Sequence, residues 1–239
     1  NLLKSKTELS KLMGLKPRTH FELAEKIKDK YELPNVEIPV ETLEKYALEN
    51  QKLLKQHNKG NRIVLIGDSI TEFWERYDSI FFSQNNYINR GISSQTTSQI
   101  LERFQNDVID LQPKCVIILA GINDIAENNG PISIEEIMNN IVSMVEKALK
   151  NNIEVVLCSI LPASDFYWNP KIKPIEKIKQ LNVLIEAYCL AEKIKFVEYY
   201  APMVDENFGL DKKFTDDGVH PNLNGYLKMK TILESYLKL

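Results

Sequence analysis

A serine, a histidine and an aspartate stand where they could act together as nucleophile, base and orienting acid. Ser69 closes the segment Gly67-Asp68-Ser69, directly after the apolar run at residues 63–66, and Asp217 precedes His220 by three residues in a late loop. A serine hydroxyl becomes a good nucleophile when a base takes its proton, and a carboxylate fixes the imidazole tautomer. We therefore predict that Ser69 is the nucleophile, His220 the general base and Asp217 its orienting acid.

The sequence also offers candidate hydrogen-bond donors for an oxyanion hole, since a tetrahedral intermediate needs two or three donors fixed in advance. Ser69 offers its own backbone N–H, and Asn123 follows a predicted strand and offers a side-chain amide. A third donor could come from Ser93 or Ser94, in the turn after the second predicted strand. Each of these residues alone, like a single Asp-x-x-His pair, also fits an ordinary turn. Their combination at successive strand ends and in the last loop favours a hydrolase.

The elements that would position these residues alternate between strand and helix from residue 61 onward. Short, apolar, β-branched runs are typical of strands buried on both faces, and the alternation predicts an α/β domain with a parallel sheet. The fifth strand is more amphipathic and is expected nearer an edge. The predicted strands cover residues 63–66, 87–90, 114–120, 154–160 and 195–199. The predicted helices cover about 131–150, 173–192 and 223–237, with another running from the 91–98 turn to about 108.

An aromatic segment at 72–82 follows the predicted nucleophile. It contains five rings: Phe73, Trp74, Tyr77, Phe81 and Phe82. These side chains could pack in the core, as aromatic residues generally do, or line an acyl or sugar pocket. Both interpretations stay open, with core packing favoured.

Residues 1–60 carry no strand pattern and predict a helical N-terminal extension packed on a catalytic domain at 61–239. Thr19 and Glu22 resemble a capping box that opens one helix, and a second helix is predicted over about 41–56. The extension could pack over the sheet edge, rim the active site or form the contact of a homodimer. His20 and His57, the other two histidines, are most simply solvated surface residues.

Composition argues against several functional classes. A net charge of −3 without a basic block gives no electrostatic support for nucleic-acid binding. No apolar run approaches the roughly 20 residues that span a bilayer. The three cysteines, Cys115, Cys158 and Cys189, lack the spacing of metal ligands and fit small buried thiols. The chain begins at Asn1, so a removed signal peptide would fit, and a secreted or periplasmic location is favoured over a cytoplasmic one.

Four blocks of the sequence, in order, resemble those of the SGNH hydrolases, also called GDSL esterases. They are Gly67-Asp68-Ser69-Ile70, Asn89-Arg90-Gly91-Ile92-Ser93-Ser94-Gln95-Thr96-Thr97, Gly121-Ile122-Asn123-Asp124 and Asp217-Gly218-Val219-His220-Pro221-Asn222. The resemblance covers about residues 61–239. It implies a flavodoxin-like three-layer α/β/α sandwich with a five-stranded parallel sheet, and the same triad of Ser69, Asp217 and His220.

The resemblance also implies an oxyanion hole made by the backbone N–H of Ser69, the Asn123 side chain and a third donor at Ser94. The family usually has glycine at that third position. A backbone donor survives the change to serine, at a cost on the order of 1 kcal/mol or more if the turn demands a positive φ.

By resemblance to bacterial platelet-activating-factor acetylhydrolase-like proteins and carbohydrate acetylesterases, we expect a serine esterase. Its substrate would be a small-molecule ester with a short acyl group, acetyl in the first place, on a carbohydrate or small lipid alcohol. Hydrolysis would run through an acyl-enzyme without a metal or organic cofactor. Two alternatives stay open: a lysophospholipase or thioesterase with the same triad, and a non-catalytic binding module on a degenerate hydrolase fold.

Overall fold

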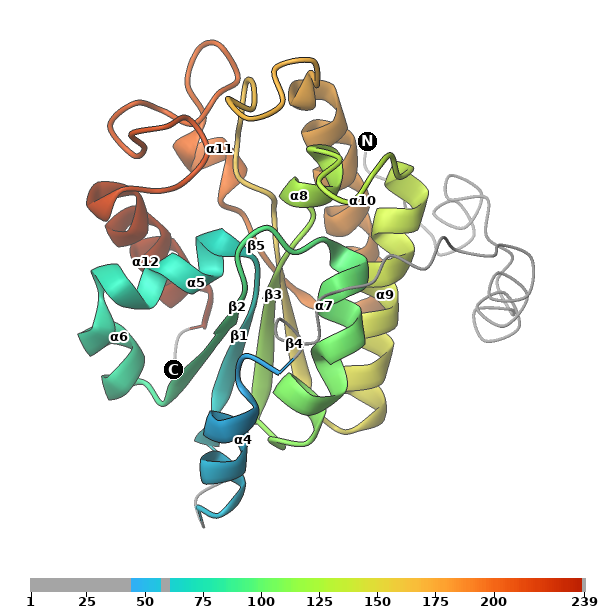
Figure 1. Cartoon of the computed structure of the whole chain (residues 1–239), viewed down its shortest axis with the longest axis vertical. Helices are drawn as coiled ribbons and strands as arrows, with labels where there is room; N and C mark the ends of the chain where they lie inside the picture. Colours follow the sequence, from blue (N-terminus) through green and yellow to red (C-terminus); the bar gives the residue numbers. More distant parts are fainter. Residues whose placement is uncertain (1–43, 57–60, 238–239) are drawn as a thin grey trace.

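Five strands form one parallel sheet at the centre of the protein (Figure 1). The computed structural model describes residues 44–56 and 61–237, and the strand order is β2-β1-β3-β4-β5. Every residue of β1 and β3 is buried, because helices cover both faces of the sheet. The five predicted strands are confirmed, and the fifth lies at an edge. The strands are β1 (Ile63–Gly67), β2 (Tyr87–Gly91), β3 (Cys115–Leu119), β4 (Glu154–Cys158) and β5 (Lys195–Val197).

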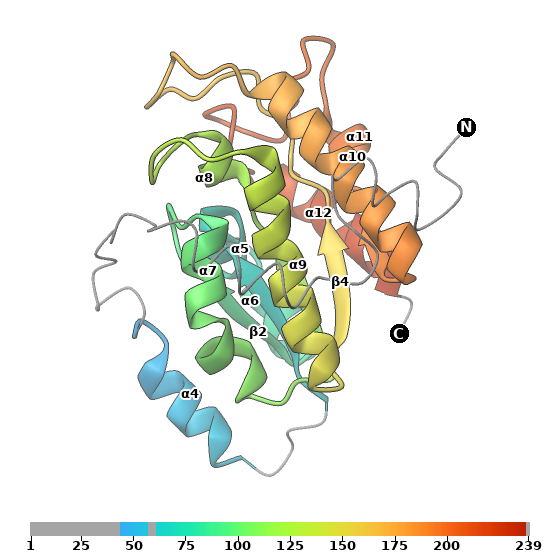
Figure 2. The ribbon, with the colours of Figure 1, turned by 90° about the vertical axis from the view of Figure 1, so that its right-hand side faces the viewer.

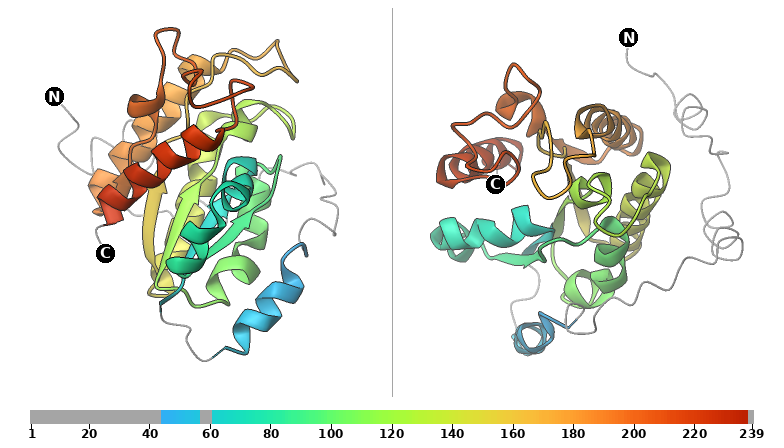
Figure 3. Two further views of the ribbon diagram at one scale, coloured as in Figure 1. Left: turned by 90° about the vertical axis from the view of Figure 1, so that its left-hand side faces the viewer. Right: turned by 45° about the horizontal axis from the view of Figure 1, so that its top comes forward.

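Helices complete a three-layer sandwich (Figures 2 and 3). One face of the sheet carries α7 (Thr97–Phe104), α9 (Ile134–Lys150) and α10 (Pro174–Glu192). The other face carries α5 (Ser69–Tyr77), α6 (Ser79–Gln84) and α12 (Leu223–Leu237). Two short helices, α8 (Ile122–Ile125) and α11 (Tyr200–Met203), lie in loops. The layers and the strand order confirm the predicted flavodoxin-like α/β fold.

Two helical features were not predicted. The aromatic segment forms two helices, because Asp78 ends α5 and its carboxylate caps α6 by accepting from the Phe81 N–H at 3.0 Å. The helix that begins with α7 continues as a π-helical turn, η2 (Gln105–Ile109). A capping box begins α9, with the Glu136 N–H donating to Ser133 Oγ at 3.2 Å.

Most of the aromatic segment packs in the core. Trp74, Phe81 and Phe82 are each at most 3% exposed and contact one another through stacked and edge-on rings. Phe73 instead faces His220, with the ring centroids 5.5 Å apart. Tyr77 is 46% exposed, and its ring lies 5.0 Å from that of Tyr226. Core packing therefore accounts for three of the five rings, and Phe73 borders the predicted site.

The last part of the predicted N-terminal extension lies within the described residues. There α4 (Ala47–Leu54) corresponds to the helix predicted over about 41–56, and it lies beside η2 (Figure 2). The helix predicted to begin at Thr19, together with His20 and His57, lies outside the described residues. In the described ranges, no helix is both long enough and apolar enough to cross a membrane.

Strand register brings three loops to the same edge of the sheet. Gly67 at the end of β1 pairs with Gly91 of β2 and Leu119 of β3, so the chain leaves all three strands at one level. Both glycines allow close approach of backbone. A Cβ on Gly67 would lie 2.3 Å from the Leu119 carbonyl oxygen, and one on Gly91 would lie 2.1 Å from the Glu72 backbone nitrogen. The segments that follow these strands are therefore held together.

Candidate active site

Ser69, His220 and Asp217 form a continuous line of hydrogen bonds at this edge. Ser69 Oγ is 2.9 Å from His220 Nε2, and His220 Nδ1 is 2.7 Å from Asp217 Oδ2. An ionised carboxylate can only accept, so Nδ1 carries the proton and donates to Asp217, and the Nε2 lone pair accepts from the Ser69 hydroxyl. The structure thus brings together the three residues predicted as nucleophile, base and acid.

Ser69 is the first residue of α5. The helix is capped by Asp68, whose carboxylate accepts from the Ile70 N–H at 3.0 Å. The Ser69 backbone N–H belongs to the first turn, where amides have no partner within the helix. Asp68 is 1% exposed, and burial raises its pKa to about 7 although the Ile70 N–H acts to lower it. The turn therefore presents a serine hydroxyl and a backbone donor side by side.

The loop before α12 holds His220 through its own hydrogen bonds. Asp217 Oδ1 accepts from the backbone N–H groups of Val219 at 2.9 Å and His220 at 2.7 Å. Thr215 Oγ1 donates to the His220 carbonyl at 2.7 Å, and Gly218 takes a φ of +85° that suits glycine. Burial acts to raise the pKa of Asp217, but the hydrogen bonds from His220 and Val219 hold it below the ordinary value. Asp217 is therefore ionised at neutral pH.

Asn123 is fixed at both ends of its carboxamide. Its Nδ2 donates to the Gln95 carbonyl at 3.0 Å, and its Oδ1 accepts from Asn128 Nδ2 at 2.8 Å. Asn128 Oδ1 in turn accepts from Trp168 Nε1 at 2.9 Å. Within the described part of the chain, the second Nδ2 proton of Asn123 has no acceptor. Asn128 and Trp168 were not predicted, because nothing in their sequence context distinguishes them from other loop residues.

Ser94 occupies the turn between β2 and α7 with a φ of +66°. A residue with a side chain pays about 1–2 kcal/mol to adopt this left-handed region. The turn is tied to its surroundings on both sides, since the Ile92 N–H donates to the Gly67 carbonyl at 3.1 Å and the Gln95 carbonyl accepts from Asn123. The condition under which serine is costly at this position is therefore met.

Aromatic rings border the histidine. The ring centroid of Trp168, which is 38% exposed, lies 6.5 Å from that of His220, and the ring centroid of Phe73 lies 5.5 Å from it. Across the described ranges, no three His, Cys, Asp or Glu side chains are grouped so that they could hold a metal ion. The three cysteines are buried free thiols.

Comparison with known proteins adds a family and a set of similar folds. The model of the GDSL-like Lipase/Acylhydrolase family matches residues 65–228. The crystal structure of a GDSL-like lipase from Bacteroides thetaiotaomicron is 47% identical, with a TM-score of 0.79, over 82% of this chain and 97% of that one. Acetylxylan esterase Axe2 from Geobacillus stearothermophilus shares the fold at 17% identity and a TM-score of 0.62, over 75% of this chain and 94% of that one.

A curated relative matches a shorter part of the chain. It is the uncharacterized lipoprotein YqeF of Bacillus subtilis, 36% identical over 78 residues. The match spans 31% of this chain and 32% of that protein.

Proposed function

This chain belongs to the GDSL-like lipase/acylhydrolase family and is an ester hydrolase, and from that premise we propose its mechanism and substrate class. It hydrolyses short-chain acyl esters, acetyl esters in the first place, of a carbohydrate or small lipid alcohol through an acyl-enzyme. The observation that carries the proposal is the line of contacts from Ser69 Oγ to His220 at 2.9 Å and from His220 to Asp217 at 2.7 Å.

In the proposed first half-reaction, Ser69 Oγ attacks the ester carbonyl carbon while His220 Nε2 takes the hydroxyl proton. Asp217 stabilises the imidazolium that forms. When the tetrahedral intermediate collapses, His220 gives this proton to the leaving alcohol and the acyl group remains on Ser69. In the second half-reaction, His220 deprotonates a water that attacks the acyl-enzyme, which releases the acid and restores the serine.

The proposed oxyanion hole has three donors: the backbone N–H groups of Ser69 and Ser94, and Asn123 Nδ2. The position of Ser69 at the start of α5 supports its role, because the first amides of a helix point at an incoming negative charge. The fixed carboxamide of Asn123 supports the second donor, since a preorganised donor needs no rearrangement as charge develops.

Acetyl esters are the first substrates to test, because an acetylxylan esterase shares the fold. Trp168 and Phe73, beside His220, would contact the alcohol or acyl group of a bound ester. A series of p-nitrophenyl esters from acetate to octanoate measures acyl preference, and acetylated sugars and lysolipids measure alcohol preference. A preference for long acyl chains over acetyl would favour a lysophospholipase or thioesterase instead.

The nucleophile is tested with p-nitrophenyl acetate and a fluorophosphonate probe. Ser69→Ala is expected to lower kcat by about a thousandfold or more and to abolish labelling. Ser83→Ala is the matched control, because this exposed serine on α6 bonds only to the Ile80 carbonyl among the described residues. Equal rates for the wild type and Ser69→Ala would show that Ser69 is not the nucleophile. A wild type that is neither labelled nor active would favour a binding module.

We also propose that the protein is exported. The support is the partial match to a Bacillus subtilis lipoprotein. Fractionation of the native cells followed by immunoblotting tests it, and a signal confined to the cytoplasmic fraction would contradict it.

A further inference from the structure

The segment around α4 sends buried polar side chains toward the turn that carries Ser94. Tyr46 and Asn50 are 9% and 5% exposed. We propose that residues 45–50, the anchor segment, position the oxyanion hole by holding residues 91–95, the oxyanion turn, in the conformation in which Ser94 donates its N–H. This inference rests on the proposed esterase function and assigns a role to part of the N-terminal extension.

The first contact is at the start of the oxyanion turn. The Tyr46 hydroxyl donates to the Gly91 carbonyl at 2.5 Å. The guanidinium of Arg90 lies over the Tyr46 ring, 4.4 Å from its centroid, so the ring as well as the hydroxyl is held against the end of β2. The position of Gly91 therefore depends on a residue outside the sheet.

The second contact reaches the residue before Ser94. Lys45 Nζ lies 2.7 Å from Glu72 Oε1, on α5. Glu72 Oε2 accepts from the Ser93 backbone N–H at 2.7 Å and from Ser93 Oγ at 2.6 Å. The carboxylate of Glu72, whose side chain is 13% exposed, thus links the anchor segment to the centre of the turn.

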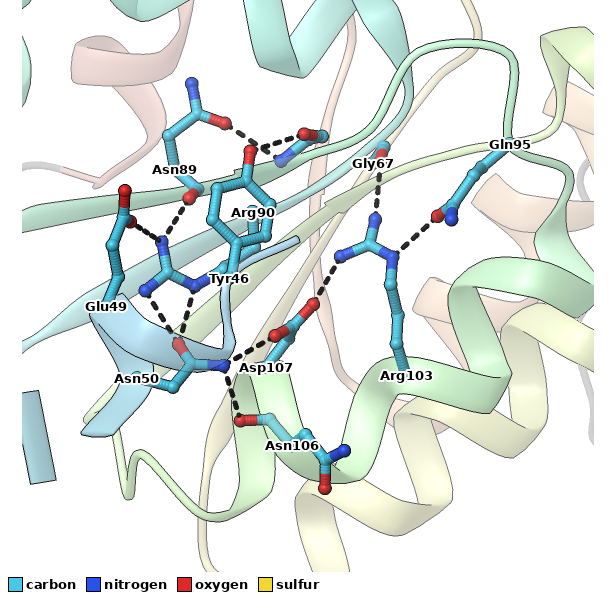
Figure 4. A network of polar contacts seen from close by, with 11 residues as sticks. Tyr46, Glu49, Asn50, Gly67, Asn89, Arg90, Gln95, Arg103, Asn106 and Asp107 are labelled. Carbon is cyan, nitrogen blue, oxygen red and sulfur yellow. Dashed lines mark hydrogen bonds and ion pairs between the residues drawn. The ribbon is translucent and has the colours of Figure 1, made fainter. Parts of the chain in front are cut away.

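The third contact is a chain of buried charges that ends at the residue after Ser94 (Figure 4). Asn50 Nδ2 donates to Asp107 Oδ1 at 2.7 Å, and Arg103 Nη1 donates to Asp107 Oδ2 at 2.8 Å. Arg103 Nε then donates to Gln95 Oε1 at 2.6 Å, and its Nη2 donates to the Gly67 carbonyl at 2.9 Å. The same guanidinium therefore holds the oxyanion turn and the end of β1.

The Asn50 carboxamide bonds to a positively charged side chain at its oxygen and to a negatively charged one at its nitrogen (Figure 4). Its Oδ1 accepts from Arg90 Nε at 3.0 Å and Nη2 at 2.7 Å, while its Nδ2 serves Asp107. Removal of this carboxamide leaves a buried guanidinium and a buried carboxylate each short of a partner. The change is transmitted to the oxyanion turn through Arg90 and Arg103.

The need for such anchors follows from the conformation of Ser94. Its φ of +66° lies in a region that serine avoids and glycine adopts freely. The residues on either side, Ser93 and Gln95, are the ones that Glu72 and Arg103 hold. The anchor segment should therefore matter less to catalysis when residue 94 is glycine.

A double-mutant cycle on the 239-residue chain tests this coupling, with kcat and KM measured on p-nitrophenyl acetate. Asn50→Ala is expected to lower kcat about tenfold while KM stays within about twofold of the wild-type value. In the Ser94→Gly background, the same substitution is expected to lower kcat by less than about threefold. Tyr46→Phe removes one hydroxyl and keeps the ring, so it tests the same point with little risk to folding. It is expected to lower kcat about threefold, again less in the Ser94→Gly background.

Lys193→Gly is the matched control, because Lys193 has a φ of +59° at the C-terminal end of α10. It relieves a similar backbone cost but is not expected to rescue kcat in either anchor variant. Equal losses of kcat in the two backgrounds, or wild-type kcat in folded Asn50→Ala and Tyr46→Phe proteins, would overturn the inference and leave a Ser69-dependent esterase in place. Absence of Ser69-dependent hydrolysis in the wild type would overturn both proposals.

Discussion

Replacement of Ser94 by glycine should stabilise the folded protein. Its φ of +66° costs a residue with a side chain about 1–2 kcal/mol, which glycine does not incur. Glycine loses roughly 0.5–1 kcal/mol more backbone entropy on folding. The Ser94 side chain is exposed and makes no hydrogen bond to any described residue, so its removal adds no further cost. The net expectation for Ser94→Gly is a gain of about 0.5–1 kcal/mol in the free energy of unfolding.

Urea denaturation followed by tryptophan fluorescence measures this gain, and thermal unfolding should show a rise in Tm of about 2 °C. Lys193→Gly should gain a similar amount at a site remote from Ser69, whereas Ser94→Ala should gain nothing because it keeps the Cβ. A lower free energy of unfolding for Ser94→Gly, beside a gain for Lys193→Gly, would refute the strain argument. Because the backbone N–H is retained, a tenfold fall in kcat would refute a role confined to that donor.

Three further substitutions test the surroundings of the site. Burial raises the pKa of Asp68 to about 7, so the contribution of this group to stability is lost as the pH rises from about 4 to 7. Asp68→Asn should remove that loss. In urea denaturation, its free energy of unfolding should rise relative to that of the wild type by a few kcal/mol between pH 5 and 8. A difference that does not change with pH would contradict this. Asn128→Asp removes the donor to Asn123 and should lower kcat about tenfold, whereas Asn129→Asp, with the same added charge, should not. Burial acts to raise the pKa of Glu72, but its contacts with Lys45 and Ser93 lower it. Those contacts therefore stabilise the protein at a pH above the ordinary pKa of glutamate, and this stabilisation is lost as the pH falls through the lowered pKa of Glu72. The stability difference between the wild type and Glu72→Gln should therefore shrink as the pH falls through the lowered pKa of Glu72, and a constant difference would count against it.

The positions of the central strands were predictable because a parallel strand covered on both faces is largely apolar, as β1 and β3 are. The break between α5 and α6 was not, because aromatic residues lie on both sides of it. Asp78 ends one helix and caps the next, and the Phe81 and Phe82 that follow it are buried in the core. A tertiary contact of this kind leaves no periodic pattern along the chain.

The site was predictable to the extent that its residues directly follow strands. Ser69 and Asn123 do so, and a parallel sheet gathers such residues at one edge. The sequence predicted a cost for serine at position 94 only if the turn requires a positive φ, and the structure has a positive φ there. Asn128 and Trp168 act through hydrogen bonds between irregular segments far apart in the chain, so no spacing indicates them.

The docking of α4 shows why its proposed role could not be predicted from apolar periodicity. Leu54, an apolar residue of α4, is 38% exposed, whereas the polar Asn50 is 5% exposed. Asparagine is usually a surface residue, and here it is buried because Arg90 and Asp107, 40 and 57 positions away, satisfy both ends of its carboxamide. An apolar contact tolerates small shifts of a helix, whereas these directional hydrogen bonds are lost when the helix moves by an ångström. Polar docking therefore fixes α4 relative to the oxyanion turn, which a positioning element requires and an ordinary apolar cover does not.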